Sequence, residues 1–136
     1  FAEMMRNGGE LGGVRILGEK TVKYMSKNHL TASIKTSALE ESPVSIPGEH
    51  GLGADFGLGF GVVSDTVKTG VLGSNGEFYW GGSAGTFFWV DPVEEMVVVG
   101  MIQLMGSPWQ FRSDSKVAAY QAIIESYEEP RIFKTA

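Results

Sequence analysis

The sequence contains no cysteine, which excludes disulfide bonds, thiolate metal sites and a cysteine nucleophile. It has only two histidines, too few for an all-histidine metal site. No apolar run approaches the roughly 20 residues that a membrane-spanning helix needs. Basic residues are in the minority, 11 against 16 acidic ones, and the net charge of −5 argues against a surface for nucleic acid or an anionic membrane.

What remains has the composition of an ordinary globular protein. The chain has 136 residues, of which 43% are hydrophobic and 20% charged, so it fits one domain or part of one. No glycine motif that cradles phosphates is present, and we expect no cofactor and no metal. The sequence does not indicate the cellular compartment of the protein.

The first residues have the pattern of a helix without its beginning. Phe1, Met4 and Met5 share one helical face, and Asn7-Gly8 is a helix stop, but no capping residue precedes them. We interpret this segment as the last turns of a longer helix, so that the chain continues upstream in the intact protein.

The rest of the chain divides into four segments that form a single partial domain. Residues 1–30 are predicted to be helical, with a second helix opening at Gly18 and carrying Val22, Met25 and His29 on one side. Residues 31–50 are rich in Ser, Thr, Pro and Glu, and we expect a long surface loop. Sheet strands follow over residues 51–106, and a closing helix over residues 113–128.

The sheet is predicted from bulky apolar runs separated by short turns. The runs cover residues 56–63, 77–83, 86–90 and 96–104, and the last is so apolar that we expect it to be buried on both faces. Asp91 is expected to fix the turn before it through its side chain. Short connections favour antiparallel pairing, so the predicted fold class is α+β, an antiparallel sheet with packed helices.

The closing helix is predicted from a capping signal and an apolar stripe. Ser113 is the expected cap, and the stripe comprises Val117, Tyr120, Ile124 and Tyr127. We expect this stripe to lie across the sheet.

The run over residues 76–92 (GEFYWGGSAGTFFWVDP) carries a family resemblance. It resembles the third-motif strand of the serine β-lactamase and penicillin-recognising superfamily, and most closely that of carboxylesterases related to class C β-lactamases. In those proteins a Lys-Thr-Gly, His-x-Gly or Trp-Gly-Gly triplet on the strand that lines the active site precedes a hairpin and a strand ending in Asp-Pro. Residues 1–28 and 96–103 are also similar, so the resemblance covers most of the chain, but only as the C-terminal part of such an enzyme.

The resemblance implies roles for four residues. Ser83 would offer its backbone N–H to the oxyanion that develops during attack on a carbonyl, and one such donor contributes about 3–4 kcal/mol of transition-state stabilisation. Trp80, Gly81 and Gly82 would bind substrate, since paired glycines let main chain approach it closely. Trp80 stands where β-lactamases carry lysine, which favours neutral esters over β-lactams. By local pattern alone, Trp80 is a core aromatic and the glycines form a bulge.

Two literal motif matches compete with this interpretation. Ser113 and Lys116 have the Ser-x-x-Lys spacing of the superfamily's nucleophile and base, but about 0.6 such matches arise by chance, and we interpret Ser113 as a helix cap. Residues 68–70 spell Lys-Thr-Gly, with turn-forming neighbours on both sides, and we expect a hairpin loop there. The choice between this triplet and Trp80-Gly81-Gly82 stays open.

The remaining polar residues give no complete catalytic set. His29 and His50 are candidate general bases, but a histidine without a spaced nucleophile or carboxylate is more often structural. The four tyrosines lack the Tyr-x-Asn context of the family's second motif.

We therefore expect the C-terminal portion of a serine hydrolase that acts through an acyl-enzyme on small esters. The substrate is a small ester or amide, and the Ser/Lys and Tyr motifs are expected on an upstream N-terminal segment, so this chain alone is inactive. A β-lactamase or a D-aminopeptidase of the same superfamily is the nearer alternative. A noncatalytic antiparallel sheet that binds a ligand or partner is the alternative from another class.

Overall fold

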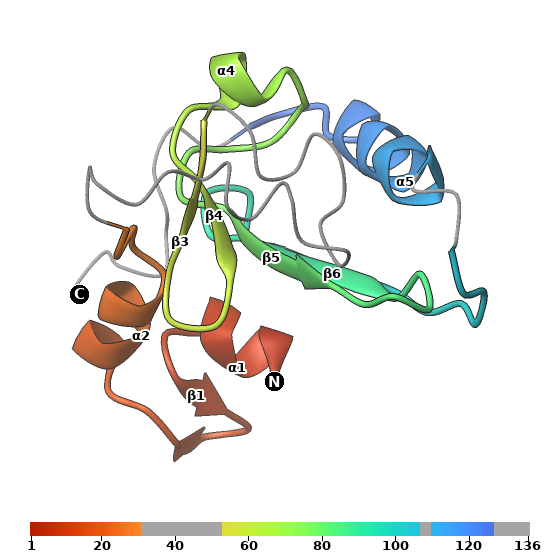
Figure 1. Ribbon diagram of the computed structural model, residues 1–136. Helices are drawn as coiled ribbons and strands as arrows, with labels where there is room; N and C mark the ends of the chain where they lie inside the picture. The colour runs from red at the N-terminus through yellow and green to blue at the C-terminus, as the bar shows by residue number, and fades with distance from the viewer. Residues whose placement is uncertain (31–52, 107–109, 127–136) are drawn as a thin grey trace.

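The computed structural model describes residues 1–30, 53–106 and 110–126, and it has the predicted α+β class. An antiparallel sheet lies between two groups of helices (Figure 1). The elements are α1 (Ala2–Arg6), β1 (Glu10–Leu11), β2 (Val14–Arg15), α2 (Glu19–Met25), β3 (Ala54–Phe56), β4 (Gly61–Val63), α4 (Thr66–Thr69), β5 (Phe78–Gly81), β6 (Phe87–Asp91), β7 (Met96–Gly100) and α5 (Gln110–Gln121).

Five strands form the main sheet, in the order β3-β4-β5-β6-β7, and each pairs antiparallel with its neighbours. Because directly paired residues project from the same face, the register sorts the side chains into rows. Phe78, Val90 and Val97 form one row. The next row along the strands, on the opposite face, begins with Tyr79 and Trp89. Each face is apolar, so each needs a covering layer.

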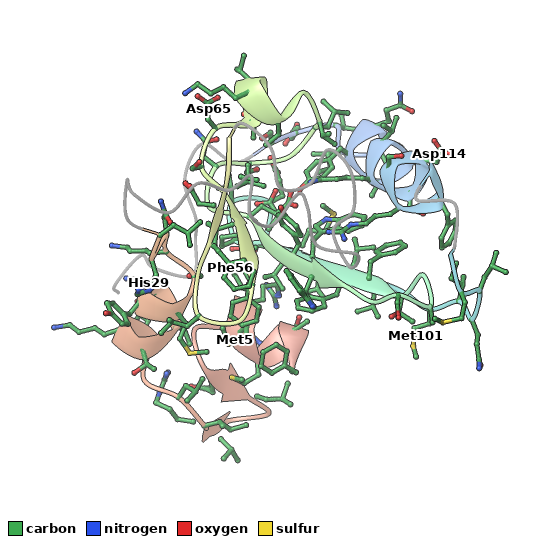
Figure 2. The ribbon with its side chains drawn as sticks, in the orientation of Figure 1. Met5, His29, Phe56, Asp65, Met101 and Asp114 are labelled. Carbon is green, nitrogen blue, oxygen red and sulfur yellow. The ribbon has the colours of Figure 1, made fainter. Side chains whose placement is uncertain are left out.

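One face of the sheet packs against α1 and α2. Met4 and Met5 of α1 and Val22 of α2 are buried there. Their partners from the sheet side are Phe60, Val62, Phe78 and Val90. The helix prediction therefore places the right methionines inward, but Phe1 stays 65% exposed at the margin of this core. Figure 2 shows Met5 between α1 and the β3–β4 hairpin.

The other face packs against α5, through a side of the helix that the sequence pattern did not predict. Arg112, Lys116 and Tyr120 recur every four residues and face the sheet. Of the described residues in the predicted stripe only Tyr120 packs against the sheet, whereas Val117 is 38% exposed and Ile124 96% exposed, so the prediction is wrong for these two residues. The helix also begins at Gln110, three residues before the predicted cap Ser113, and ends at Gln121. Tyr127 lies outside the described residues.

Two predicted strands differ from the observed ones. The run over residues 56–63 is not one strand, because it contains the last residue of β3, a turn over residues 57–60 and all of β4. In the turn the N–H of Gly57 donates to the carbonyl of Phe60. The last apolar run ends as a strand at Gly100, and β7 is half-buried because β6 is its single partner among the described strands. Val99 is 58% exposed, so the expected burial on both faces is wrong.

Main-chain contacts hold the helical segment over residues 1–30 together and connect it to the sheet. A two-stranded hairpin, β1–β2, separates α1 from α2. After α2 the N–H of His29 donates to the carbonyl of Phe56, which ties the segment to β3. The loop predicted over residues 31–50 lies outside the described part of the chain. None of the helices described is long and apolar enough to cross a membrane.

Candidate functional site

The connection between β5 and β6 is a tight hairpin. Gly81 pairs with Phe87, and beyond them the N–H of Gly82 donates to the carbonyl of Thr86 at 2.8 Å. The N–H of Gly85 donates back to the carbonyl of Gly82 at 2.9 Å, which closes a four-residue turn. Gly85 has φ +81°, the left-handed conformation that ends a three-residue hairpin loop and that glycine adopts at no steric cost.

Ser83 occupies the first of the two central positions of this turn. It is exposed, and none of the backbone hydrogen bonds in the described segments uses its N–H as donor. The neighbouring N–H of Gly82 is occupied by Thr86. The N–H of Ser83 is therefore an unengaged main-chain donor within this hairpin, beside paired strands that hold the turn.

A groove of about 370 Å³ lies beside this turn, over the ends of β5, β6 and β7. The strand register determines which side chains form the bottom of the groove. Trp80, Phe88 and Val99 are paired across the strands and form one row there. This is the face that α1 and α2 cover farther along the strands, and Phe88 contributes both to that core and to the groove. Its lining consists of Trp80, Gly81, Gly82, Thr86, Phe87, Phe88, Val99, Gly100 and Met101.

The groove is apolar and carries no charged side chain among its lining residues. Trp80 forms one side and is half-buried. Its ring meets that of Phe56 edge to face, with centroids 5.3 Å apart and planes at 81°. Trp80 is therefore held by a side-chain contact outside the core clusters, and its indole is a wall of the groove.

Gly82 allows close packing at the mouth of the groove. A Cβ atom at Gly82 would lie 2.7 Å from Oγ1 of Thr86, its partner across the hairpin. A side chain there would displace Thr86 and narrow the space next to Ser83. The absence of a side chain keeps main chain exposed to the groove, as the sequence argument expects of this strand.

The second triplet, Lys68-Thr69-Gly70, lies elsewhere. It lies in the connection between the antiparallel strands β4 and β5, as predicted, but this connection contains α4, a single helical turn capped by Asp65 and ended by Gly70 at φ +67°. The Lys68 ammonium pairs with Asp65 at 2.9 Å and is exposed. Figure 2 shows Asp65 at the opposite end of the sheet from Met101, which lines the groove.

The Ser-x-x-Lys match does not form a nucleophile and base. Ser113 is exposed on α5, whereas Nζ of Lys116 lies 2.6 Å from Oε1 of the buried Glu77. Lys116 is thus bound in an ion pair beneath the helix. The match is therefore interpreted as a chance occurrence.

The histidines also give no catalytic set. His29 Nε2 lies 2.6 Å from the carbonyl oxygen of Tyr24, and its ring packs edge to face on the Tyr24 ring, so its contacts are structural. His50 lies outside the described residues. In residues 1–30, 53–106 and 110–126 no three His, Asp or Glu side chains gather into a metal site.

Sequence reasoning finds the hairpin but misses most of the groove. Phe88, Val99 and Met101 line the groove and Phe56 packs on Trp80, but none of these four residues belongs to a motif. Their positions depend on strand register and on the β3–β4 turn. The available signal was the length of the apolar run after Asp91, which extends past the end of β7 to the exposed Met101.

Comparisons with known proteins identify the family of this chain. The model of the family described as Beta-lactamase matches residues 3–123. Two curated proteins of Mycobacterium tuberculosis, the uncharacterized protein MT1414 of strain CDC 1551 / Oshkosh and protein Rv1367c of strain ATCC 25618 / H37Rv, are each 31% identical over 106 residues. That match covers 76% of this chain and 25% of each relative, so the chain spans about a quarter of their length.

Two solved structures have the same fold. EstCE1, described as a hydrolase with promiscuous acyltransferase activity, is 25% identical with a TM-score of 0.68 over 88% of this chain and 27% of its own. Simvastatin synthase (LovD) from Aspergillus terreus is 17% identical with a TM-score of 0.68 over 91% of this chain and 32% of its own.

Proposed function

Because the chain belongs to the Beta-lactamase family, whose fold serves hydrolases and acyltransferases, we propose that it is the C-terminal portion of a serine hydrolase acting on small esters. The observation that carries the proposal is the unengaged N–H of Ser83, which directly follows Gly82 in the lining of an uncharged groove. The chain supplies the Trp80-Gly81-Gly82 strand and the oxyanion donor, and the nucleophile comes from outside it.

In the proposed reaction a serine hydroxyl attacks the ester carbonyl. Its oxygen bonds to the carbonyl carbon, its proton passes to a base, and the carbonyl oxygen gains negative charge. The N–H of Ser83 donates to that oxygen, which lowers the barrier because the donor is already positioned. The alcohol then leaves with a proton, and water hydrolyses the acyl-enzyme to release the acid and restore the serine.

The lining of the groove favours neutral substrates. Trp80 and Phe88 present ring surface, and no lysine or arginine lies among the lining residues to bind a substrate carboxylate. A small ester loses little on entering such a site, whereas a carboxylate would be desolvated without a partner. Esters are therefore proposed ahead of β-lactams and D-amino-acid amides.

The proposed upstream segment has a surface to cover. Apolar side chains are exposed on and after the outer strand β7, and they comprise Val99 (58%), Met101 (81%), Leu104 (53%) and Met105 (72%). An apolar edge strand with one partner is a template for further pairing. The chain spans only about a quarter of the curated relatives, so a longer protein has ample chain to carry the Ser/Lys and Tyr motifs there.

Covalent labelling tests the proposal. The full-length protein is treated with a fluorophosphonate, digested, and mapped by mass spectrometry. We expect one labelled serine, outside the sequence of this chain, and loss of esterase activity in proportion to labelling. A full-length product without any adduct would favour the noncatalytic sheet module. An adduct on Ser113 that Ser113→Ala abolishes would move the nucleophile into this chain.

A further inference from the structure

A buried polar cluster lies under α5, at the end of β5 away from the groove. Glu77, which precedes β5, and Asp91, the last residue of β6, are both 0% exposed. Tyr120 and Lys116 of α5 reach down to them. No step of the proposed reaction uses these residues, and the inference below is independent of the proposed function.

Two carboxyl oxygens lie within hydrogen-bond distance of the Tyr120 hydroxyl, which can donate to only one of them. That oxygen lies 2.8 Å from Oε2 of Glu77 and 2.6 Å from Oδ2 of Asp91. A tyrosine hydroxyl carries one proton and donates one hydrogen bond. If both carboxyls were ionised, one of these two short contacts would join oxygens with no proton between them.

The other polar atoms of the two carboxyls have partners already. Oε1 of Glu77 accepts from Nζ of Lys116 at 2.6 Å. Oδ1 of Asp91 accepts from the N–H groups of Val93 at 2.9 Å and Glu94 at 3.1 Å. Rearranging those atoms therefore cannot supply the missing proton. It must sit on the chain of oxygens that runs from Glu77 through Tyr120 to Asp91.

We propose that Glu77, Tyr120 and Asp91 form a buried proton-binding site, in which one proton beyond that of the tyrosine is shared by the two carboxyls and holds α5 on the sheet. With that proton on Glu77, its hydroxyl donates to Tyr120, which in turn donates to Asp91. Every contact then has one donor and one acceptor. The charge of Lys116 is balanced by a single carboxylate.

The surroundings favour the neutral arrangement. Within the described segments the titratable groups that face Glu77 are Lys116 and Tyr120 from α5 and Asp91 from β6. Two carboxylates and one ammonium would leave a net negative charge in a site walled by Trp89, which is 0% exposed. Gly73 closes the site on another side, since a Cβ there would lie 2.6 Å from Oε2 of Glu77.

The titration directions agree with this assignment. Burial raises the pKa of Glu77 above its ordinary value of 4.5, and it outweighs the opposing effect of Lys116. Burial and the two carboxyls raise the pKa of Tyr120, so its hydroxyl keeps its proton. A folded-state pKa above the unfolded value means that stability from the bound proton is complete below pH 4.5 and falls as pH rises toward the folded-state value.

Amide substitutions test the site, because an amide nitrogen can replace the shared proton. In Glu77→Gln the new NH₂ donates to Tyr120, which donates to Asp91. In Asp91→Asn the direction reverses, and Tyr120 donates to an ionised Glu77. We expect each single variant to fold. The double variant places two amide donors on Tyr120 and leaves its own hydroxyl without an acceptor, so it should lose more stability than the two single changes together.

The readout is the pH dependence of unfolding of the full-length protein. We expect the folding constant of the wild type to fall as pH rises above 4.5, relative to the folding constant of either single variant at the same pH. The steepest decline is about tenfold per pH unit, which is the slope when a single titrating group releases one proton on unfolding. Glu19→Gln is the matched control. It makes the same chemical change at an exposed carboxyl whose pKa is lowered by Lys23, and it should leave the decline of the folding constant with pH unchanged.

Infrared spectroscopy gives a second readout that needs no unfolding. The carbonyl stretch of a protonated carboxyl group should appear in the wild-type minus Glu77→Gln difference spectrum of the native protein at neutral pH. Its absence, together with an unchanged pH dependence in Glu77→Gln, would overturn the proposal. Additive losses in the double variant would also contradict it.

Discussion

The ring of Phe87 occupies the space that a side chain on Gly100 would need. These residues pair directly between β6 and β7, and a Cβ at Gly100 would lie 2.2 Å from Cζ of Phe87. The ring is confined, because it stacks on Trp89 at 5.7 Å and meets Phe111 of α5 at 5.6 Å. Gly100 thus permits the aromatic layer beneath α5 to form next to the groove.

Gly100→Ala should accordingly lower the free energy of unfolding by about 1–3 kcal/mol, the range for overpacking a filled core. Denaturant titration measures it. Because the clash is with one ring, the double variant Gly100→Ala/Phe87→Leu should lose less than the sum of its single changes. A full additive loss would show that the contact is not the cause.

Ser83→Pro should remove the proposed oxyanion donor while keeping the turn. Proline lacks the N–H and suits the first central position of a turn, which Ser83 occupies between Gly82 and Gly85. We expect kcat of the full-length esterase to fall by about 10²–10³, the effect of losing one such donor. Ser83→Ala keeps the N–H and should retain wild-type kcat. Equal kcat values in the two variants would disprove the assigned role.

Trp80→Lys should shift substrate preference toward anionic substrates. It places a cation in a groove that has no charged lining residue, where it can donate to a substrate carboxylate. Compared with Trp80→Leu, which stays neutral, we expect the ratio of kcat/KM for a carboxylate-bearing over a neutral ester to rise at least about tenfold, since such a bond contributes about 1.5–3 kcal/mol. An unchanged ratio would place the substrate away from residue 80.

Glu95→Gly should stabilise the turn between β6 and β7. Glu95 has φ +52°, a left-handed conformation that costs a residue with a side chain about 1–2 kcal/mol. Glycine avoids this cost but loses about 0.5–1 kcal/mol through chain entropy. We therefore expect the free energy of unfolding to rise by about 0.5–1 kcal/mol, whereas Glu95→Val should lower it. Thermal and denaturant unfolding would show whether the two variants differ in sign.

Much of the fold could be predicted because its signals are local. The bulky run that ends at Asp91 predicts a strand, and Asp91 caps the following turn through Oδ1 as expected. Gly8 follows the end of α1 with φ +65°, as the helix-stop pattern predicts. The family resemblance depends on a contiguous run of residues, which can be recognised without any knowledge of tertiary contacts. The match to the family model confirms the resemblance.

The inward face of α5 could not be predicted, because hydrophobicity was the wrong guide. A sequence pattern assumes that apolar side chains face the core. Here the residues that face the sheet are Arg112, Lys116 and Tyr120. They contact aromatic rings and buried carboxyl groups of the sheet. Those partners are 29 to 43 residues away for Tyr120, so no local window contains both sides of the contact.

The sequence by itself determined the strands β5 and β6, the turn at Asp91 and the family, since each depends on neighbours along the chain. Only the tertiary structure decided that Trp80, Phe88 and Val99 share one row and that Glu77 and Asp91 meet at one hydroxyl. Strand register and the choice of a helix face are set by which surfaces exclude water together, and that is a property of the assembled chain.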